Sequence, residues 1–334
     1  METGSDHKML ERLRKDGHVR STQARAVPLP GGVSSEIYLV EDGAKKWVVK
    51  CALEKLKVQE DWFADISRNR FEREYMTYVG AFLPRAVPRI EFEGDGYFAM
   101  EYIGEGFVNW KQSMLGGRYE PDHARQAGET LGVIHRTSAG DETAQQKFDS
   151  TGNFHQLRSH PYLVTTGSRH PDLTAQFEKE VLRLESTREC LVHGDYSPKN
   201  ILISETRLVV LDCEVAWYGD PAFDLAFLLT HLHLKAVHRP SAAPVLAAMA
   251  QQSVSAYLAA RSMGEQQNAA LMRRTCRLLL MLLLARIDGK SPVEYLNESA
   301  PKKWVRRFTR KALLGNSRTL TEVSAAWYRQ VAEL

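Results

Sequence analysis

A short polar segment, His193-Gly194-Asp195-Tyr196-Ser197-Pro198-Lys199-Asn200, constrains this chain more than any other part of its sequence. Two apolar runs follow it, at 201–203 and 208–211, and the polar residues between them predict a short β-hairpin. Asp212-Cys213-Glu214 comes directly after the second run. Because a hairpin folds the chain back on itself, Asn200 and Asp212 are expected to lie close together, with Asp195 on the loop before them.

These residue types suit phosphoryl transfer. The reaction needs a carboxylate that accepts the proton of the attacking hydroxyl, and oxygen ligands for a Mg²⁺ ion that neutralises the nucleotide phosphates. Asp195 can be the carboxylate, and Asn200 and Asp212 can be the ligands. An Asp five residues before an Asn, on a loop that leads into a strand, also has the spacing of a kinase catalytic loop. The segment therefore predicts a Mg²⁺-dependent phosphotransferase.

A second block, Gly219-Asp220-Pro221-Ala222-Phe223-Asp224-Leu225-Ala226, stands a few residues further on. Together with 193–200 and 211–214, it resembles the aminoglycoside phosphotransferase and choline kinase superfamily. The resemblance implies an α+β, two-lobed protein-kinase-like fold, with a small antiparallel-sheet lobe and a larger, mainly helical lobe, that binds ATP and Mg²⁺. It also implies that Asp195 is the catalytic base, that Asn200 and Asp212 bind Mg²⁺, and that His193 and Asp224 support the catalytic loop without reacting.

Three further residues are interpreted against this pattern. The methylthioribose kinases, a neighbouring branch, usually lack the Asn that stands here as Asn200, so the sequence does not assign the chain to that branch. Glu214 has two interpretations, a water-mediated contact with a second metal ion or a hydrogen bond within the loop. His135 ends an apolar stretch where the family commonly has a His, and we expect it to pack against the catalytic loop.

The N-terminal part resembles the nucleotide-binding lobe of the same superfamily. Trp47-Val48-Val49-Lys50 resembles the strand whose lysine binds the α- and β-phosphates. That lysine needs a glutamate from the helix predicted at 68–82, where Phe71, Tyr75, Tyr78, Val79 and Phe82 form one apolar stripe. Glu72 and Glu74 both flank this stripe, and helical phase does not choose between them. The resemblance favours Glu74.

Two more segments of this lobe are candidate nucleotide contacts. In 31–35, Gly32 allows the backbone to approach a phosphate closely, and the hydroxyls of Ser34 and Ser35 can donate to phosphate oxygens. Met100-Glu101-Tyr102-Ile103 resembles the hinge of the family, where adenine would bind the backbone of Glu101 and Ile103. A β-turn is the alternative interpretation of 31–35.

The chain as a whole is expected to contain a leader segment at 1–20, an N-lobe at 21–104 and a helical C-lobe at 105–334. The net charge of +3 does not indicate nucleic-acid binding, and the longest apolar run, 278–285, is far shorter than the roughly 20 residues of a membrane span. The four cysteines form no CxxC pair. These features favour a cytoplasmic enzyme whose partner is a small hydroxylated substrate.

The acceptor is the open question, and charge bears on it. Residues 222–334 carry 16 basic and 7 acidic side chains, whereas the whole chain has an excess of only three basic ones. Because the late helices wall the acceptor pocket in this superfamily, Arg286, Asp288 and Lys290 are candidate substrate contacts. The alternative is a helix end capped by Gly289 in the left-handed conformation. A basic region would repel a polycation, which favours a sugar or a hydroxy acid.

Two alternatives stay open: an aminoglycoside-modifying resistance kinase, and a catalytically inactive kinase-like scaffold that binds nucleotides. The residues Lys50, Asp195, Asn200 and Asp212 are all present, which argues against the scaffold. A basic amphipathic helix is predicted at 302–311, and we interpret it as a solvated surface helix rather than a partner-binding one. His231 and His233 are interpreted as residues on the surface of a helix that do not share a metal.

Overall fold

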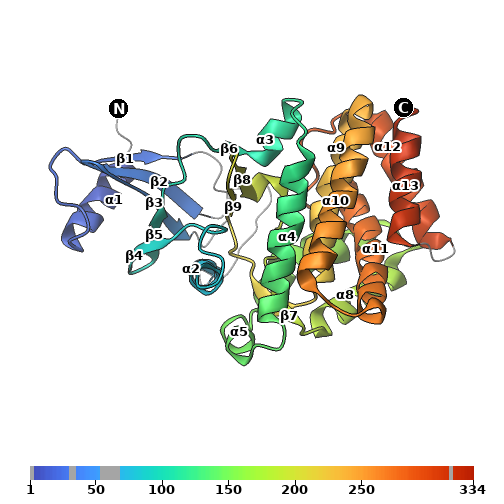
Figure 1. Ribbon diagram of the computed structural model, residues 1–334, viewed down its shortest axis with the longest axis horizontal. Helices are drawn as coiled ribbons and strands as arrows, with labels where there is room; N and C mark the ends of the chain where they lie inside the picture. Colours follow the sequence, from blue (N-terminus) through green and yellow to red (C-terminus); the bar gives the residue numbers. More distant parts are fainter. Residues whose placement is uncertain (1–3, 30–34, 53–67, 316–318) are drawn as a thin grey trace. The chain divides into compact units, whose positions relative to one another are not determined.

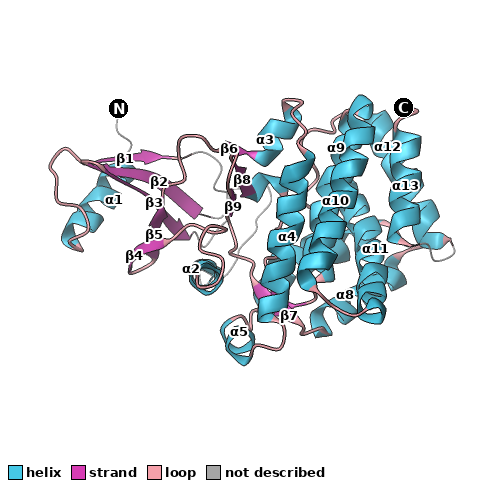
Figure 2. Cartoon of the chain, viewed as in Figure 1, coloured by secondary structure: helices cyan, strands magenta, loops and turns pink. Residues whose placement is uncertain are grey.

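The computed structural model describes residues 4–29, 35–52, 68–315 and 319–334, and the chain divides into two compact units (Figure 1). The N-terminal unit comprises Met1–Phe107 and Leu211–Glu214, and the helical unit comprises Val108–Val210 and Val215–Leu334. Strands make up much of the first unit and helices most of the second (Figure 2). The expected α+β organisation is confirmed. The segment after the hairpin, 211–214, groups with the N-terminal unit.

The N-terminal unit is built on a five-stranded antiparallel sheet with the order β1-β2-β3-β5-β4. Its strands are β1 (Arg25–Pro28), β2 (Ser35–Asp42), β3 (Lys45–Ala52), β4 (Ile90–Gly94) and β5 (Tyr97–Glu101). The turn between β2 and β3 passes through Gly43, whose φ of +64° is a conformation that glycine adopts without strain. Both predicted strand pairs of this lobe, around Gly43 and around 94–96, are confirmed.

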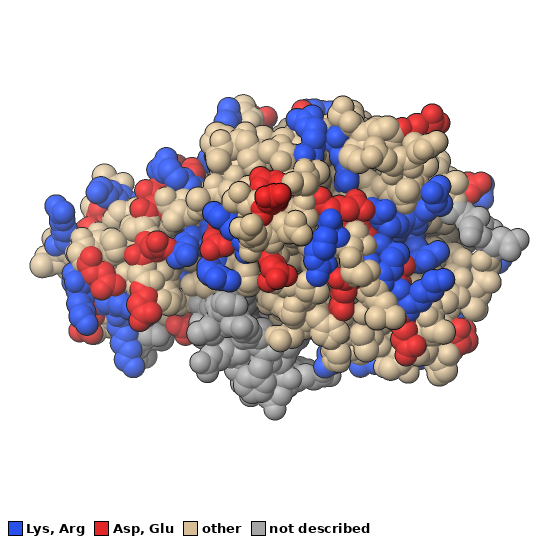
Figure 3. All heavy atoms as spheres, turned by 90° about the horizontal axis from the view of Figure 1, so that it is seen from below, with Lys and Arg blue, Asp and Glu red and all other residues tan. Residues whose placement is uncertain are grey.

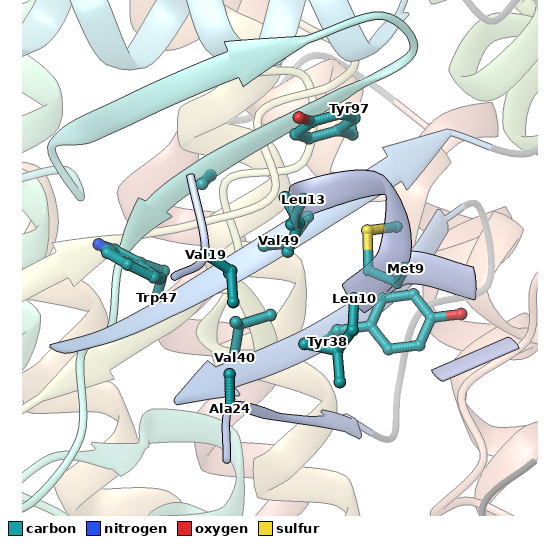
Figure 4. Close-up of a cluster of buried hydrophobic side chains, with 11 residues drawn as sticks. Met9, Leu10, Leu13, Val19, Ala24, Tyr38, Val40, Trp47, Val49 and Tyr97 are labelled. Atoms are coloured by element: carbon teal, nitrogen blue, oxygen red, sulfur yellow. The ribbon is translucent and has the colours of Figure 1, made fainter. Parts of the chain in front are cut away.

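Two helices pack on opposite faces of this sheet. Met9, Leu10 and Leu13 of α1 (Gly4–Lys15) belong to the same buried cluster as Val40 and Val49 (Figure 4). Successive side chains of a strand point to opposite faces. Lys50 therefore lies on the other face of β3, where it meets α2 (Arg68–Gly80). The N-terminal helix thus stabilises the sheet and leaves the face with Lys50 available for a site.

The helical unit contains the remaining elements. Its helices are α3 (Trp110–Leu115), α4 (Pro121–Ser138), α5 (Glu142–Lys147), α6 (Thr151–Phe154), a π-helix (His155–Val164), α7 (Thr165–Arg169), α8 (Thr174–Ser186), α9 (Ala222–His238), α10 (Ala243–Arg261), α11 (Glu265–Asp288), α12 (Ser299–Leu314) and α13 (Leu320–Val331), with 3₁₀ turns at Pro198–Asn200 and Pro240–Ala242. Its strands form two small sheets, β6-β8-β9 and β10-β7: β6 (Val108–Asn109), β7 (Cys190–Val192), β8 (Ile201–Ile203), β9 (Leu208–Val210) and β10 (Trp217–Gly219). The pairing of Ile201 with Val210 confirms the predicted hairpin.

Helix α9 is the centre of this unit, because every residue from Ala222 to Val237 is buried. The surface positions expected for His231 and His233 are therefore wrong: neighbouring helices cover both faces of α9. Helices α4 and α10 pack closely, since a Cβ at Gly128 would lie 2.1 Å from the carbonyl oxygen of Ser253. No helix in the described part of the chain is long and apolar enough to cross a membrane.

Candidate active site

The loop between β7 and β8 holds Asp195 in the helical unit. Gly194 has a φ of +77°, and a Cβ there would lie 2.7 Å from the carbonyl oxygen of Val215, so only glycine fits this position. The backbone N–H of Asp195 donates to Nδ1 of His193 at 3.1 Å. The Asn200 amide Nδ2 donates to the carbonyl oxygen of Asp195 at 3.0 Å. These hydrogen bonds fix the loop from both of its ends.

Asp224, near the start of α9, supports the same loop. Its fully buried carboxylate accepts the backbone N–H groups of His193 at 2.7 Å and Gly194 at 2.9 Å. The ring of His135 on α4 lies behind it, with Nε2 3.3 Å from Asp224 Oδ2 and Nδ1 2.9 Å from the Tyr257 hydroxyl. Burial lowers the pKa of His135 against the opposing effect of Asp224. His135 thus reaches the catalytic loop through Asp224.

The Asp195 carboxylate itself meets two cations. Asp195 is 4% exposed, and its Oδ2 lies 2.9 Å from Nη2 of Arg158 and 3.1 Å from Nζ of Lys199. Arg158 is held in turn by the carbonyl oxygens of Gly194 at 2.5 Å and Leu157 at 2.6 Å. The guanidinium therefore orients both the loop backbone and the carboxylate.

Sequence reasoning missed Arg158. It lies in the π-helix, a form that often occurs at functional sites. A signal was present, because Phe154, Leu157 and Tyr162 place an apolar stripe at helical spacing and Arg158 falls within it. A charged residue inside such a stripe is buried and needs a partner.

In the N-terminal unit, Lys50 is paired with Glu72, and the sequence-based preference for Glu74 is wrong. Lys50 is 2% exposed, and its Nζ lies 2.8 Å from Glu72 Oε1. Met76 is buried whereas Tyr78 is only half-buried, so the buried face of α2 is centred closer to Glu72 than the five-residue stripe suggested. Glu74 lies on the half-buried side of the helix.

The segment after the hairpin adds two carboxylates to this lysine. Nζ of Lys50 lies 2.6 Å from Asp212 Oδ1, and carboxylate oxygens of Glu72, Asp212 and Glu214 all lie within 4.8 Å of one another. Asp212 has a φ of +60°, a strained conformation for a non-glycine residue and one that clusters at functional sites. Burial alone would lower the pKa of Lys50, but the charges of Asp212, Glu72 and Glu214 raise it well above its usual value.

We call Lys50, Glu72, Asp212 and Glu214 the acidic cluster. Three carboxylates surround one ammonium group, so the cluster has an excess of negative charge that a further cation can balance. Carboxylate oxygens are the ligands that Mg²⁺ prefers, and the chemistry of this donor set therefore fits that ion.

The other predicted nucleotide contacts are placed as follows. Ser35 is buried at the start of β2, whereas Gly32 and Ser34 lie outside the described residues. Glu101 is the last residue of β5, and its backbone N–H donates to the carbonyl oxygen of Arg89 at 2.8 Å. Ile103 follows two residues later.

The three candidate acceptor contacts differ in burial and in their partners. Arg286 of α11 is buried, and its Nη1 donates to the Tyr162 hydroxyl at 3.2 Å. Asp288 instead accepts Arg306 of α12 at 2.7 to 2.9 Å and lies 3.0 Å from Nε2 of His170. Lys290 is exposed.

The end of α11 and the basic helix α12 both differ in part from the expectations. Gly289 does not cap the helix in the left-handed conformation: its φ is −82°, and glycine fits there because a Cβ would lie 2.6 Å from the carbonyl oxygen of Ala285. The basic helix α12 buries Trp304 and Val305 against the unit, and Arg310 pairs with Asp172 at 2.8 Å. Part of its basic face is therefore already paired.

Comparison with known proteins decides the family. Residues 25–263 match the model of the phosphotransferase enzyme family. The chain belongs to this family. Among its curated relatives is the methylthioribose kinase of Yersinia pseudotuberculosis serotype O:3 (strain YPIII), 25% identical over 258 residues, which are 67% of this chain and 63% of the relative. The methylthioribose kinase of Pectobacterium atrosepticum is 24% identical over 67% of this chain and 64% of the relative. The chain thus matches less than two thirds of the length of these relatives.

Solved structures support the fold. The amicoumacin kinase hAmiN has a TM-score of 0.59 at 12% identity, covering 91% of this chain and 95% of its own. The streptomycin–ATP–APH(2″)-IIa complex has a TM-score of 0.51 at 15% identity, covering 86% of this chain and 93% of its own. The ethanolamine kinase of Plasmodium vivax has a TM-score of 0.52 at 11% identity, covering 95% and 84%. The two-lobed fold expected from the resemblance is thus the fold of this chain.

Proposed function

We propose that this protein is an ATP- and Mg²⁺-dependent kinase of a small hydroxylated metabolite, either a sugar or a hydroxy acid. The observation that carries the proposal is the catalytic loop, in which Asp224, His193 and Asn200 hold the backbone around Asp195. Arg158 orients the buried carboxylate of Asp195. In the reaction, the acceptor oxygen bonds to the γ-phosphorus, the bond from that phosphorus to the bridging oxygen breaks, and ADP leaves. Asp195 takes the proton of the acceptor hydroxyl.

The remaining residues bind and orient. Lys50, fixed by Glu72, is proposed to bind the α- and β-phosphates, while the backbone of Glu101 and Ile103 receives the adenine and Ser35 lies at the phosphate loop. Asp212 and Asn200 would hold Mg²⁺, and the two neighbouring carboxylates of the acidic cluster would add negative charge beside the ion. When bound, the ion neutralises phosphate charge. Arg158 and Lys199 are positioning residues for the Asp195 carboxylate.

Two observations favour a sugar or hydroxy acid over an aminoglycoside. The two curated relatives named above are methylthioribose kinases, although Asn200 separates this chain from the usual pattern of that branch. The 222–334 region is basic, and not only on its surface. Basic and acidic side chains alternate over much of the face in Figure 3, but Lys235 and Arg286 are buried in the helical unit. A polycation would be repelled there.

The test is a screen for acceptor-dependent ADP release with ATP and Mg²⁺ over polyols, sugars, hydroxy acids, amino alcohols and aminoglycosides. We expect turnover with a sugar or hydroxy acid, and its loss in Asp195→Asn. A clear preference in kcat/KM for aminoglycosides would favour the resistance-kinase alternative. Nucleotide binding without turnover of any acceptor would favour the scaffold.

A further inference from the structure

A buried lysine of α9 has no role in the reaction proposed above. Lys235 is 1% exposed, and among the residues that the structure describes its Nζ has no hydrogen-bond partner. The ring of Tyr295 lies 5.0 Å from Nζ in a cation–π contact, which supplies no opposite charge. Burying an ammonium without a carboxylate is unfavourable, because the hydration that it loses is not replaced. A lysine in this position keeps its proton less readily than usual, unless an anion binds beside it.

Arg286 on α11 is also a buried positive charge without an opposite charge beside it in the described part of the chain. It is 8% exposed, and its guanidinium donates to neutral oxygens: the Tyr162 hydroxyl at 3.2 Å, the Ser291 hydroxyl at 2.9 Å and the Ser291 carbonyl. Its Nε has no hydrogen-bond partner within the described ranges, and no described carboxylate forms an ion pair with it. A guanidinium is charged at every physiological pH. One fixed positive charge is thus buried without its counter-ion.

The two groups lie against one short segment of the chain: Arg286 donates to Ser291, and the ring of Tyr295, four residues later, lies 5.0 Å from Nζ of Lys235. Burial lowers the pKa of Lys235 to about 7, the charges of Lys111 and Arg286 act in the same direction, and Glu294 opposes them. Glu294 is itself paired with Lys111, so it compensates little of the remaining charge. Burial together with Arg286, Lys235, Lys199 and Lys111 also lowers the pKa of His231 well below its ordinary value.

This region adjoins the catalytic carboxylate within the helical unit. The Tyr162 ring lies 5.7 Å from the guanidinium carbon of Arg286 and 5.7 Å from that of Arg158. Arg158 pairs with Asp195 at 2.9 Å. Burial would raise the pKa of the Tyr162 phenol, but the charges of Arg286 and Arg158 lower it below its usual value. Tyr162 therefore lies between Arg286 and Arg158, the arginine that pairs with Asp195.

We propose that Lys235 and Arg286 bind the anionic group, a carboxylate or a phosphate, of the hydroxylated acceptor that Asp195 deprotonates. The anionic group supplies the negative counter-charge for Lys235 and Arg286. The hydroxyl of the acceptor is then held on the side of Tyr162 where Asp195 lies. The identity of the acceptor as a kinase substrate rests on the proposed function. The anion site itself does not, because it can be measured without ATP.

The first experiment measures binding by the full chain without nucleotide. Three probes share one carbon skeleton: glycerol, glycerate and glycerol 3-phosphate. Calorimetry is carried out on the wild type, Lys235→Met and Lys303→Met, a matched control whose lysine is exposed on α12. We expect glycerate or glycerol 3-phosphate to bind at least tenfold more tightly than glycerol. Lys235→Met should lose that preference, and Lys303→Met should keep it. Whichever anion binds better identifies the headgroup as carboxylate or phosphate.

The second experiment uses the acceptor found in the screen, with its neutral and anionic analogues. Lys235→Met should lower kcat/KM for the anionic acceptor by at least about tenfold and change that of the neutral analogue less than threefold. Arg286→Lys keeps a positive charge and guards against a loss of folding, which circular dichroism checks for both variants. It should retain part of the preference for the anion.

The outcomes separate the two proposals. Anion binding that depends on Lys235, without turnover of any acceptor, would keep the anion site and remove the kinase assignment. A kcat/KM for the anionic acceptor that is unchanged in a folded Lys235→Met would keep the kinase and overturn the anion site. Equal binding of glycerol and both anions by the wild type would also overturn it.

Discussion

Two lysines of this protein are equally buried and sit in opposite electrostatic surroundings. Lys50, on β3, is 2% exposed and is surrounded by the carboxylates of the acidic cluster; Lys235, on α9, is 1% exposed and has cations as its main charged neighbours. The pKa of Lys50 is raised and that of Lys235 is lowered. Burial is the same for both, so the difference comes from the neighbours. One site carries surplus negative charge and suits a cation, and the other carries surplus positive charge and suits an anion.

Removing a carboxylate from the acidic cluster should have the largest effect. Asp212→Ala is expected to lower turnover by ~10³-fold or more, because a kinase loses the ligand that places Mg²⁺ against the phosphates. Titration of ATP with and without Mg²⁺ should show weaker nucleotide binding only when the ion is present. Equal weakening in both conditions would mean that Asp212 is structural and that the cluster does not bind the metal.

Replacement of Asp195, the proposed base, should have the next largest effect. Asp195→Asn preserves the shape of the side chain and removes its ability to take a proton, so kcat should fall by ~10²-fold or more while ATP affinity hardly changes. Steady-state kinetics and nucleotide titration together give both numbers. A variant with nearly wild-type kcat would exclude Asp195 as the base.

A smaller effect distinguishes the two glutamates of α2. Glu72→Gln removes the charge that holds Lys50, and we expect the KM for ATP to rise by roughly tenfold, in line with the loss of a buried charged hydrogen bond. Glu74→Gln is the matched control and should stay within about twofold of the wild type. The reverse order would restore Glu74 as the partner of Lys50.

The sequence predicted the parts of the site that are local. The catalytic loop and its hairpin could be predicted because their residues are adjacent and their turn is short. Glu72 was missed because a stripe that includes Tyr78 leaves Glu72 and Glu74 equally placed, and the resemblance then favoured Glu74. The burial of Met76, which favours Glu72, was not part of that pattern. Arg158 was missed because its partner lies 37 residues further along the chain.

The surroundings of α9 could not be predicted in the same way. Its mixture of Leu, His and Lys indicates a helix. The sequence does not show that this helix is covered on every side, because that depends on how the surrounding helices pack against it. His231 and His233 were placed on the surface for this reason. The sequence showed that 222–334 has an excess of basic residues. Only the fold shows that two of them, Lys235 and Arg286, are buried.

The contrast between the two lysines is the central claim, and stability tests it most directly. The free energy of unfolding of Lys50→Met and Lys235→Met should be measured by urea denaturation from pH 6 to pH 9, without ATP or acceptor. Lys50→Met leaves three carboxylates without their cation and should destabilise the protein by about 2 kcal/mol or more.

Lys235→Met removes an uncompensated cation and should stabilise the protein. The unfolded lysine has a pKa near 10.4 and the folded one a pKa of about 7, so the wild type regains stability as the pH rises between these values. The advantage of Lys235→Met should therefore be greatest below pH 7, at roughly 2 kcal/mol or more, and should shrink by pH 9. Opposite signs for the two variants are the predicted result. Destabilisation by both, at every pH, would contradict the account.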